Sequence, residues 1–347
     1  MPTPTSHFER EIAQQPDVLR KLLQHPVPKD VGAALRAAPP KQVLTLARGS
    51  SDNAVMFFSY LVGTTLGYAV ASVPPSLVTI YRAPLNPSDA LVVGVSQSGE
   101  SQDVVAALKA LAATGATTLA VSNHEGSSLE RAADYAVSLG VGAEQAIAAS
   151  KTFTAQMMAL ALVVAEWADD DALRDALLRV PDALDQLLED TSAIDAAAVR
   201  LTHAEQIDVL GRGLAFGPAQ EIALKLKETT YIHAHAYSSA EFQHGPIASL
   251  GSGEPVLLLG MDDVSSATTL EAAVKLKTTG AHLMVMASNQ DLLSQASTPI
   301  PLPPETSPVV QAFLHVVGGQ WLALRTAQER GLDPDAPRHL NKVTQTL

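Results

Sequence analysis

The sequence predicts an α/β protein made of two tandem domains, each a doubly wound parallel sheet flanked by helices. Three observations support this fold class. A charge-free apolar strand over residues 91–95 leads through a turn rich in serine into a helix over 103–111. Such a strand is typical of a parallel sheet that is buried on both faces. The chain also repeats itself, and residues 144–202 between the two copies have helical patterns throughout.

The internal repeat sets the predicted domain organisation. The two copies match at a spacing of about 165 residues, and each has the order strand, helix, strand, helix, strand. We place the boundary near residue 190, so that residues 1–190 form the first domain with an N-terminal helical arm, and 191–347 form the second with the C-terminal tail. The matched pairs are residues 43–54 with 207–219, 91–111 with 256–276, and 114–123 with 279–289.

Composition excludes several classes of protein. The 347 residues contain no cysteine, which excludes disulfides, thiolate metal sites and a thiol nucleophile. A net charge of −13 argues against nucleic acid or an anionic membrane as a partner. No apolar run reaches the roughly 18 residues of a membrane span, and the N-terminus does not have the pattern of a secretory signal. We therefore expect a cytoplasmic protein.

The turn after the buried strand has the composition of an anion site. It precedes a helix N-terminus, whose unpaired N–H groups and dipole favour negative charge. The turn has no lysine, so a single phosphate on a small molecule fits better than a nucleotide triphosphate. Ser50 and Ser51 follow the first strand, at the sheet edge where ligands of such folds bind. The alternative is an ordinary helix cap, in which Ser101 and Glu100 merely start a helix.

The second copy lacks these hydroxyl clusters. Leu214 and Ala215 take the places of Ser50 and Ser51, and Asp262 and Asp263 stand in the turn that corresponds to residues 96–101. Two carboxylates would repel a phosphate. We therefore predict that only the first copy binds phosphate.

Candidate reacting groups lie in the second copy. Glu221, Lys225 and Glu228 share one face of a predicted helix that follows a buried strand, so its first turns should line the cleft; a solvated face of Glu–Lys pairs is the alternative. His244 precedes Gly-Pro at a turn where an imidazole can be aimed. His233 and His235 lack a third ligand at a recognisable spacing, so a structural role is expected of them rather than metal binding.

A nicotinamide site is not expected. Residues 211–217 have the spacing GxGxxxG, and no acidic residue lies at the roughly 20-residue distance where a ribose hydroxyl would be held. No cofactor and no metal are therefore predicted.

Five motifs, in order, carry a family resemblance over nearly the whole chain: ARGSSDNA, VSQSGESQD, AEQAIAASKTFTAQ, EIALKLKETTYIHAHAYSSAEFQHGP and DPDAPRHLNKVTQTL. The chain resembles the sugar isomerase (SIS) family, and specifically the isomerase domain of glucosamine-6-phosphate synthase. The resemblance implies that both predicted domains are SIS domains, the first with the phosphate-binding loop and the second with the catalytic helix.

The resemblance also implies roles for individual residues. Glu228 looks like the base that moves a proton between C1 and C2, and His244 looks like the ring-opening histidine, which in the family reaches the active site of the neighbouring subunit. A homodimer with a shared site is therefore expected. Lys342 looks like the tail lysine that forms a Schiff base in the synthase. The phosphate binders implied are Ser51, Ser96, Gln97, Ser98 and Ser101, with supporting contacts from Glu221, Lys225 and the backbone around Ile147.

One departure from the synthase shapes the expected reaction. The synthase has an N-terminal glutaminase domain with a cysteine nucleophile, and this sequence has neither, so glutamine is not expected to donate nitrogen through this chain. The resemblance then favours an amino-sugar phosphate deaminase/isomerase, with glucosamine 6-phosphate going to fructose 6-phosphate and ammonia. Alternatives are a sugar-phosphate isomerase, a fructosamine-phosphate deglycase or a galactosamine-phosphate deaminase.

A sugar-phosphate-binding regulator is the alternative outside the enzymes. It would need the serine turns but has no use for Glu228, His244 and Lys342 together. The tail that carries Lys342 also fits a frayed terminus by composition, since it contains Pro334 and Pro337 and little apolar periodicity. Against that alternative, we predict that Lys342→Ala, or deletion after Arg338, lowers turnover at least tenfold while leaving folding stability nearly unchanged.

Overall fold

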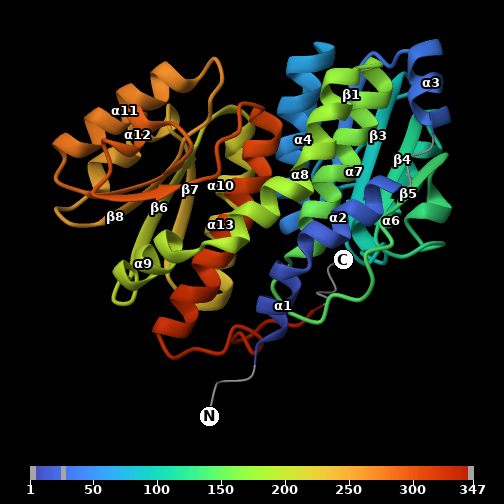
Figure 1. The fold of residues 1–347 in the computed structure, drawn as a ribbon. Coiled ribbons are helices and arrows are strands. Elements are labelled where there is room, and N and C mark those ends of the chain that lie inside the picture. Colours follow the sequence, from blue (N-terminus) through green and yellow to red (C-terminus); the bar gives the residue numbers. More distant parts are fainter. Residues whose placement is uncertain (1–4, 25–28, 343–347) are drawn as a thin grey trace. The chain divides into compact units, whose positions relative to one another are not determined.

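A computed structural model describes residues 5–24 and 29–342, and it contains two five-stranded parallel sheets flanked by helices (Figure 1). The predicted fold class is confirmed. In the first sheet the strand order is β2-β1-β3-β4-β5, and the central strand β3 is buried along its whole length, as its charge-free sequence predicts. The strands are β1 (Gln42–Leu46), β2 (Val70–Ser72), β3 (Ala90–Ser96), β4 (Thr117–Ser122) and β5 (Tyr135–Ser138).

The second sheet repeats this topology. Its order is β10-β9-β8-β6-β7, which reads the same as the first sheet from the opposite edge, with β8 in the place of β3. All its pairings are parallel, so the carboxyl ends of the strands lie at one edge in each sheet. The strands are β6 (Gln206–Gly211), β7 (His233–Ser238), β8 (Pro255–Leu259), β9 (His282–Ala287) and β10 (Thr298–Pro301).

Helices cover both faces of each sheet. In the first, α4 packs with α7 while α5 and α6 pack together around Val92, Val104 and Leu108; in the second, α10 packs with α13, and α11 covers Val256 and Leu258. The helices are α1 (His7–Ala13), α2 (Gln15–Gln24), α3 (Lys29–Ala37), α4 (Ser50–Leu66), α5 (Pro75–Thr79), α6 (Gln102–Ala112), α7 (Lys151–Ala168), α8 (Asp171–Glu189), α9 (Ser192–Arg200), α10 (Phe216–Thr230), α11 (Ser266–Thr278), α12 (Gln290–Leu293) and α13 (Pro308–Glu329), with 3-10 turns η1 (Glu130–Ala132), η2 (Gly213–Ala215), η3 (Glu241–His244) and η4 (Pro246–Ser249).

The prediction that residues 144–202 are helical throughout is wrong at their start. Regular helix begins at Lys151, and the segment 145–150 is irregular. The physical reason is that the buried carboxylate of Glu11 accepts the backbone N–H groups of Gln145 and Ala146, at 2.6 and 3.1 Å. These groups are thereby taken by a side chain rather than by a helical ladder.

The described chain divides into two compact units. The first-repeat unit comprises residues 17–24, 29–144, 151–178 and 341–342, and the second-repeat unit comprises 5–16, 145–150 and 179–340. The domain boundary near residue 190 stays a prediction. Within residues 5–24 and 29–342, no helix has both the length and the apolar character needed to span a membrane.

Candidate active site

The serine turn, residues 96–101, joins the carboxyl end of β3 to α6. The hydroxyl oxygens of Ser96 and Ser101 lie 3.0 Å apart, and Ser96 Oγ also accepts the N–H of Gly99 at 3.2 Å. Ser101 is the N-cap residue of α6, but its side chain makes no capping hydrogen bond. An ordinary N-cap serine would bind the helix's own N–H groups. The hydroxyl is instead turned toward its neighbour across the turn, so the ordinary-cap interpretation does not account for it.

Gly99 makes the turn's shape sterically feasible. Its φ is +66°, and a Cβ built there would lie 2.3 Å from Ser127 Oγ, so no other residue fits without displacing the backbone. Glu100, the turn's one acidic residue, accepts the N–H of Ser128 at 2.9 Å. Hydrogen bonds from Ser128 lower the pKa of the Glu100 carboxyl. The carboxylate is thus engaged by Ser128, on the loop after β4.

The second hydroxyl cluster adjoins the first because β1 pairs with β3. Ser51 is buried in the first turn of α4, where its Oγ accepts Gln156 Nε2 from α7 at 3.0 Å. Arg48 Nε, at the end of β1, donates to Asp103 Oδ2 in the first turn of α6 at 3.0 Å, and the Asp103 side chain is buried. This ion pair ties the two serine clusters to one sheet edge, as the sequence predicts. Arg48, Asp103 and Gln156 are not among the predicted site residues, although all three stand within the motifs that carry the family resemblance.

The corresponding edge of the second sheet is filled by its own carboxylate. Asp262 follows β8, and its two oxygens accept hydrogen bonds from Ser288 Oγ at 2.9 Å, Asn289 Nδ2 at 3.0 Å and Gln311 Nε2 at 3.0 Å. Asp263 accepts the N–H and hydroxyl of Ser265 ahead of α11. The polar donors at this edge therefore already donate to the carboxylates of Asp262 and Asp263, which carry the same negative charge as a phosphate. That only the first copy binds phosphate stays a prediction.

Three charged side chains meet on α10 of the second-repeat unit. Lys225 Nζ lies 3.4 Å from Glu221 Oε1 and 2.5 Å from Glu228 Oε2. The side chains of Glu221 and Lys225 are 0% and 1% exposed, whereas that of Glu228 is 19% exposed. The solvated-face alternative is therefore wrong. A buried ammonium holds two carboxylates, and Glu228 is the one that solvent reaches.

The three candidate histidines of the second repeat occupy exposed positions. His244 ends η3 and is followed by Gly245, whose φ of +150° favours glycine and fixes the turn. His233 and His235 lie on the exposed face of β7, and His235 Nδ1 is 4.0 Å from Asp208 Oδ1. In the part of the chain that the structure describes, no group of three or more His, Asp or Glu side chains is arranged to hold a metal.

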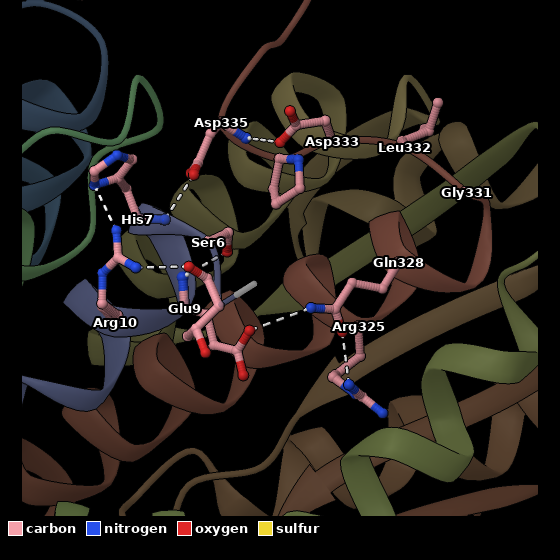
Figure 2. Close-up of a pocket in the computed structure, with 12 residues that line it drawn as sticks. Ser6, His7, Glu9, Arg10, Arg325, Gln328, Gly331, Leu332, Asp333 and Asp335 are labelled. Carbon is pink, nitrogen blue, oxygen red and sulfur yellow. Dashed lines mark hydrogen bonds between the residues drawn. The ribbon is translucent and has the colours of Figure 1, made fainter. Parts of the chain in front are cut away.

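The tail is anchored at several points, contrary to the frayed-terminus interpretation. Asp335 accepts the N–H of His7 at 2.6 Å (Figure 2) and the N–H of Phe8 at 2.9 Å, both at the start of α1. Arg338 donates its N–H to Tyr231 Oη and stacks its guanidinium 4.6 Å from the Tyr231 ring centroid. Lys342 Nζ then lies 2.8 Å from Glu144 Oε2. Residues 343–347 of the tail motif lie outside the described residues.

The pocket in Figure 2 belongs to this anchoring rather than to the predicted site. It has a volume of about 910 Å³ and is lined by residues of the N-terminal arm, of the last turns of α13 and of the segment after α13, among them Arg10, Gln328 and Asp335. Arg10 binds the carbonyl of Thr5 and His7 Nδ1, so its guanidinium is used within the arm. None of the predicted site residues lines this pocket.

Ile147 is half-buried in the segment 145–150, and polar side chains shape that backbone. Besides the Glu11 contacts, Gln320 Nε2 donates to the carbonyl of Ser150 at 3.4 Å, and Gln15 Nε2 donates to Gln320 Oε1 at 2.7 Å.

The described site residues fall into two sets according to the compact unit that contains them. Ser50, Ser51, Ser96, Gln97, Ser98, Ser101 and Lys342 belong to the first-repeat unit, and Ile147, Glu221, Lys225, Glu228 and His244 to the second-repeat unit.

Comparison with known proteins decides the family. The model of the SIS domain matches residues 38–165 and 200–327, one match for each sheet. This chain belongs to the SIS family. The duplicated topology of the SIS chain and the two family matches therefore describe the same repeat, which confirms the fold that the resemblance implied.

Relatives of this SIS chain include the glutamine–fructose-6-phosphate aminotransferases (isomerizing) of Methanothermobacter thermautotrophicus, 33% identical, and Pyrobaculum aerophilum, 35% identical. Each match covers 97% of this chain and 57% of the relative, so the chain spans little more than half the length of either. A solved structure from Silicibacter pomeroyi, provisionally assigned as a phosphosugar isomerase, is 33% identical with a TM-score of 0.86, over 95% of this chain and 100% of the other.

A glucosamine-6-phosphate deaminase from Thermotoga maritima shares the SIS fold. Its structure has a TM-score of 0.79 and 24% identity, and the match covers 98% of this chain and 100% of the other. At that identity the likeness concerns the fold alone. Together the comparisons show that the chain belongs to the SIS family and that its fold is shared with proteins named as phosphosugar isomerases and deaminases.

Proposed function

We propose that this SIS protein is an amino-sugar phosphate deaminase that couples aldose–ketose isomerisation to ammonia release, with glucosamine 6-phosphate and water giving fructose 6-phosphate and ammonia. The observation that carries the proposal is the α10 cluster, in which buried Lys225 holds Glu228 at 2.5 Å and leaves it partly exposed. A positioned carboxylate is the group that a proton transfer between carbon atoms needs. A sugar-phosphate-binding regulator would have no use for it.

The residues divide the work as follows. The serine turn and Ser51 bind the phosphate through hydroxyl and backbone donors, and His244 assists ring opening. Glu228 removes the proton from C2 of the open aldehyde and returns it to C1. The aldehyde oxygen gains a proton from solvent and the nitrogen releases one to solvent, so that the 2-amino aldehyde passes through an enolamine to an imine at C2 with a hydroxyl at C1. Water then adds to the imine and ammonia leaves. The Lys342 ammonium stabilises charge on the oxygens and nitrogen at C1 and C2.

The experiment is a substrate panel with two readouts, ammonia and ketose phosphate. Glucosamine 6-phosphate is expected to give both products in equal amounts. Galactosamine 6-phosphate and fructosamine 6-phosphate distinguish the related deaminase and deglycase reactions, and glucose 6-phosphate tests isomerisation alone. Ketose formation from glucose 6-phosphate without ammonia from any amino sugar would identify a simple isomerase. Saturable binding without turnover would identify a regulator.

A shared active site across a homodimer gives a prediction of its own. Glu228→Gln and His244→Ala should each be inactive alone. If His244 serves the partner's site, each hybrid dimer has one site with both groups intact, so a random mixture should recover about a quarter of wild-type activity. Size-exclusion chromatography with differently tagged subunits verifies exchange. Absence of recovery in demonstrably mixed dimers would place His244 in its own subunit's site.

We also propose the cytoplasm as the location of the enzyme.

Replacement of Lys342 is expected to lower turnover at least tenfold. The same change should also cost stability, because it leaves the buried Glu144 carboxylate without its ammonium partner. We expect about 1–3 kcal/mol for Lys342→Ala, less than for a fully buried pair since the lysine is partly exposed. The sequence alone led us to expect nearly unchanged folding stability for this variant, and the Glu144 contact is the reason for the revised expectation. Urea unfolding measures the loss, and full activity of the variant would exclude a role for Lys342.

The chemistry also predicts how Lys342 reacts with sugar. A deaminase substrate already carries its nitrogen, so the lysine need not form a covalent bond to it. Borohydride treatment with fructose 6-phosphate is therefore expected to give little or no adduct at Lys342. Strong trapping, detected by mass spectrometry, would establish a Schiff base as in the synthase.

A further inference from the structure

The Glu144 side chain has the environment of a group that positions another. It is 0% exposed, and it stands immediately before the irregular segment 145–150. Its Oε1 accepts the N–H of Thr152 at 3.1 Å, and its Oε2 accepts Thr152 Oγ1 at 2.7 Å and Lys342 Nζ at 2.8 Å. All three residues belong to the first-repeat unit.

The contacts with Thr152 orient the Glu144 carboxylate independently of Lys342. Thr152 lies in the first turn of α7, where the helix dipole and the N–H groups favour a carboxylate. Its two hydrogen bonds, one to each oxygen, set the rotation of the carboxyl plane. The Lys342 ammonium then meets an acceptor that is already oriented, at a point where the tail has no regular secondary structure of its own.

A lysine side chain has among the largest rotamer freedoms of any residue, and a buried carboxylate needs a cationic or hydrogen-bonding partner. The pair satisfies both conditions. The ion pair restricts the position of Lys342 Nζ. It also anchors the tail at Lys342, one residue after Asn341, where the chain returns to the first-repeat unit. Removing the charge of Glu144 should free the lysine without touching the serine turn.

We propose that Glu144 is the positioning residue of Lys342, holding its Nζ in place for the reacting end of the sugar. This inference rests on the proposed function for the part that concerns turnover. It separates two measurable quantities: kcat depends on the Glu144–Lys342 pair, whereas KM is governed chiefly by phosphate binding at the serine turn.

The first test is a double-mutant cycle of Glu144→Gln and Lys342→Gln with kcat and KM as readouts. Glu144→Gln is expected to lower kcat about tenfold with KM within about twofold, and the double variant should be no slower than Lys342→Gln, because both changes remove the same ion pair. Multiplicative losses would show that Glu144 acts independently of the lysine, which overturns the proposal. Glu130→Gln is the matched control, since Glu130 accepts hydroxyls of Ser122 and Ser138 in the same unit; it should stay within twofold of wild type.

The second test does not depend on activity. Partial acetylation with acetic anhydride, followed by mass spectrometry, measures the reactivity of Lys342 against that of Lys41, an exposed lysine paired with Asp89. Lys342 is expected to react at least threefold faster in Glu144→Gln, with Lys41 unchanged. Equal labelling of Lys342 in both proteins would overturn the proposal. If Lys342 is labelled faster in Glu144→Gln but the wild-type protein turns over no amino sugar, the Glu144–Lys342 pairing is supported and the proposed deaminase function is contradicted.

Two further variants guard against loss of folding. Thr152→Val keeps every charge but removes the hydroxyl that orients Glu144, and it should shift kcat and Lys342 labelling in the same direction by a smaller factor. Glu144→Gln with Lys342→Gln removes both charges together and should retain the native circular dichroism spectrum. If Thr152→Val leaves kcat and labelling at wild-type values while Glu144→Gln is unfolded, the positioning role is overturned.

Discussion

Glu228→Gln is expected to lower turnover of glucosamine 6-phosphate by 10²–10⁴-fold while substrate binding survives. A general base contributes about this factor when it transfers a proton in the transition state. The amide keeps the size of the side chain and can still accept from Lys225, which lies 2.5 Å from Glu228 Oε2, so the helix should keep its structure. Steady-state kinetics with ammonia detection, together with a phosphate-ester binding isotherm, separate the two effects.

Glu221→Gln is the matched control for that experiment. Glu221 lies on the same face of α10 and contacts the same lysine at 3.4 Å, but its side chain is fully buried. A modest loss is expected, arising from the altered support of Lys225. Near-normal turnover of Glu228→Gln would mean that the base is elsewhere, and Glu221 would become the next residue to test.

Ser96→Ala and Ser98→Ala are each expected to weaken sugar-phosphate binding roughly ten- to hundredfold. A hydroxyl that donates to a phosphate oxygen makes a charge-assisted hydrogen bond worth about 1.5–3 kcal/mol. Ser96 Oγ is already within 3.0 Å of Ser101 Oγ and accepts Gly99 N–H, so its removal also loosens the turn. Isothermal titration with a non-reactive sugar phosphate measures the loss directly.

The location of the phosphate provides the control for the serine variants. Asp262→Ala should leave sugar-phosphate affinity near the wild-type value, because that residue belongs to the other repeat and its oxygens are bound by Ser288, Asn289 and Gln311. A crystal soaked with a sugar phosphate is expected to show the phosphate on residues 96–101. A phosphate found beside Asp262 would contradict the assignment of the phosphate site to the serine turn.

Much of the fold can be predicted from the sequence because its signals are local. A charge-free run predicts the buried strand β3, helical spacing predicts α6 and α10, and the repeat predicts that both sheets share one topology. The irregular segment 145–150 could not be predicted, because its apolar composition resembles the helix that follows. Its conformation depends on Glu11, a residue that lies more than a hundred positions earlier in the chain.

The pairings within the candidate site also depend on residues far apart in sequence. Gln156 and Ser51 are separated by 105 positions, and Lys342 and Glu144 by 198. Periodicity tells which face a residue occupies but not which partner it meets there. The same limit explains the tail, whose prolines suggest fraying while its anchors lie on α1 and at the end of α10. The sequence therefore predicts the types of group in the site better than it predicts their contacts.

The Asp262 carboxylate illustrates how a duplicated gene segment can diverge in function. Two copies with one topology would begin with equal capacity for an anionic ligand at the same sheet edge. In the second copy a single acidic side chain binds the local donors and becomes part of the packing at that edge. Under the proposed function, the first copy keeps the phosphate site and the second copy carries the reacting groups of α10. Relatives with a small neutral residue at this position would be the place to look for the ancestral, two-ligand arrangement.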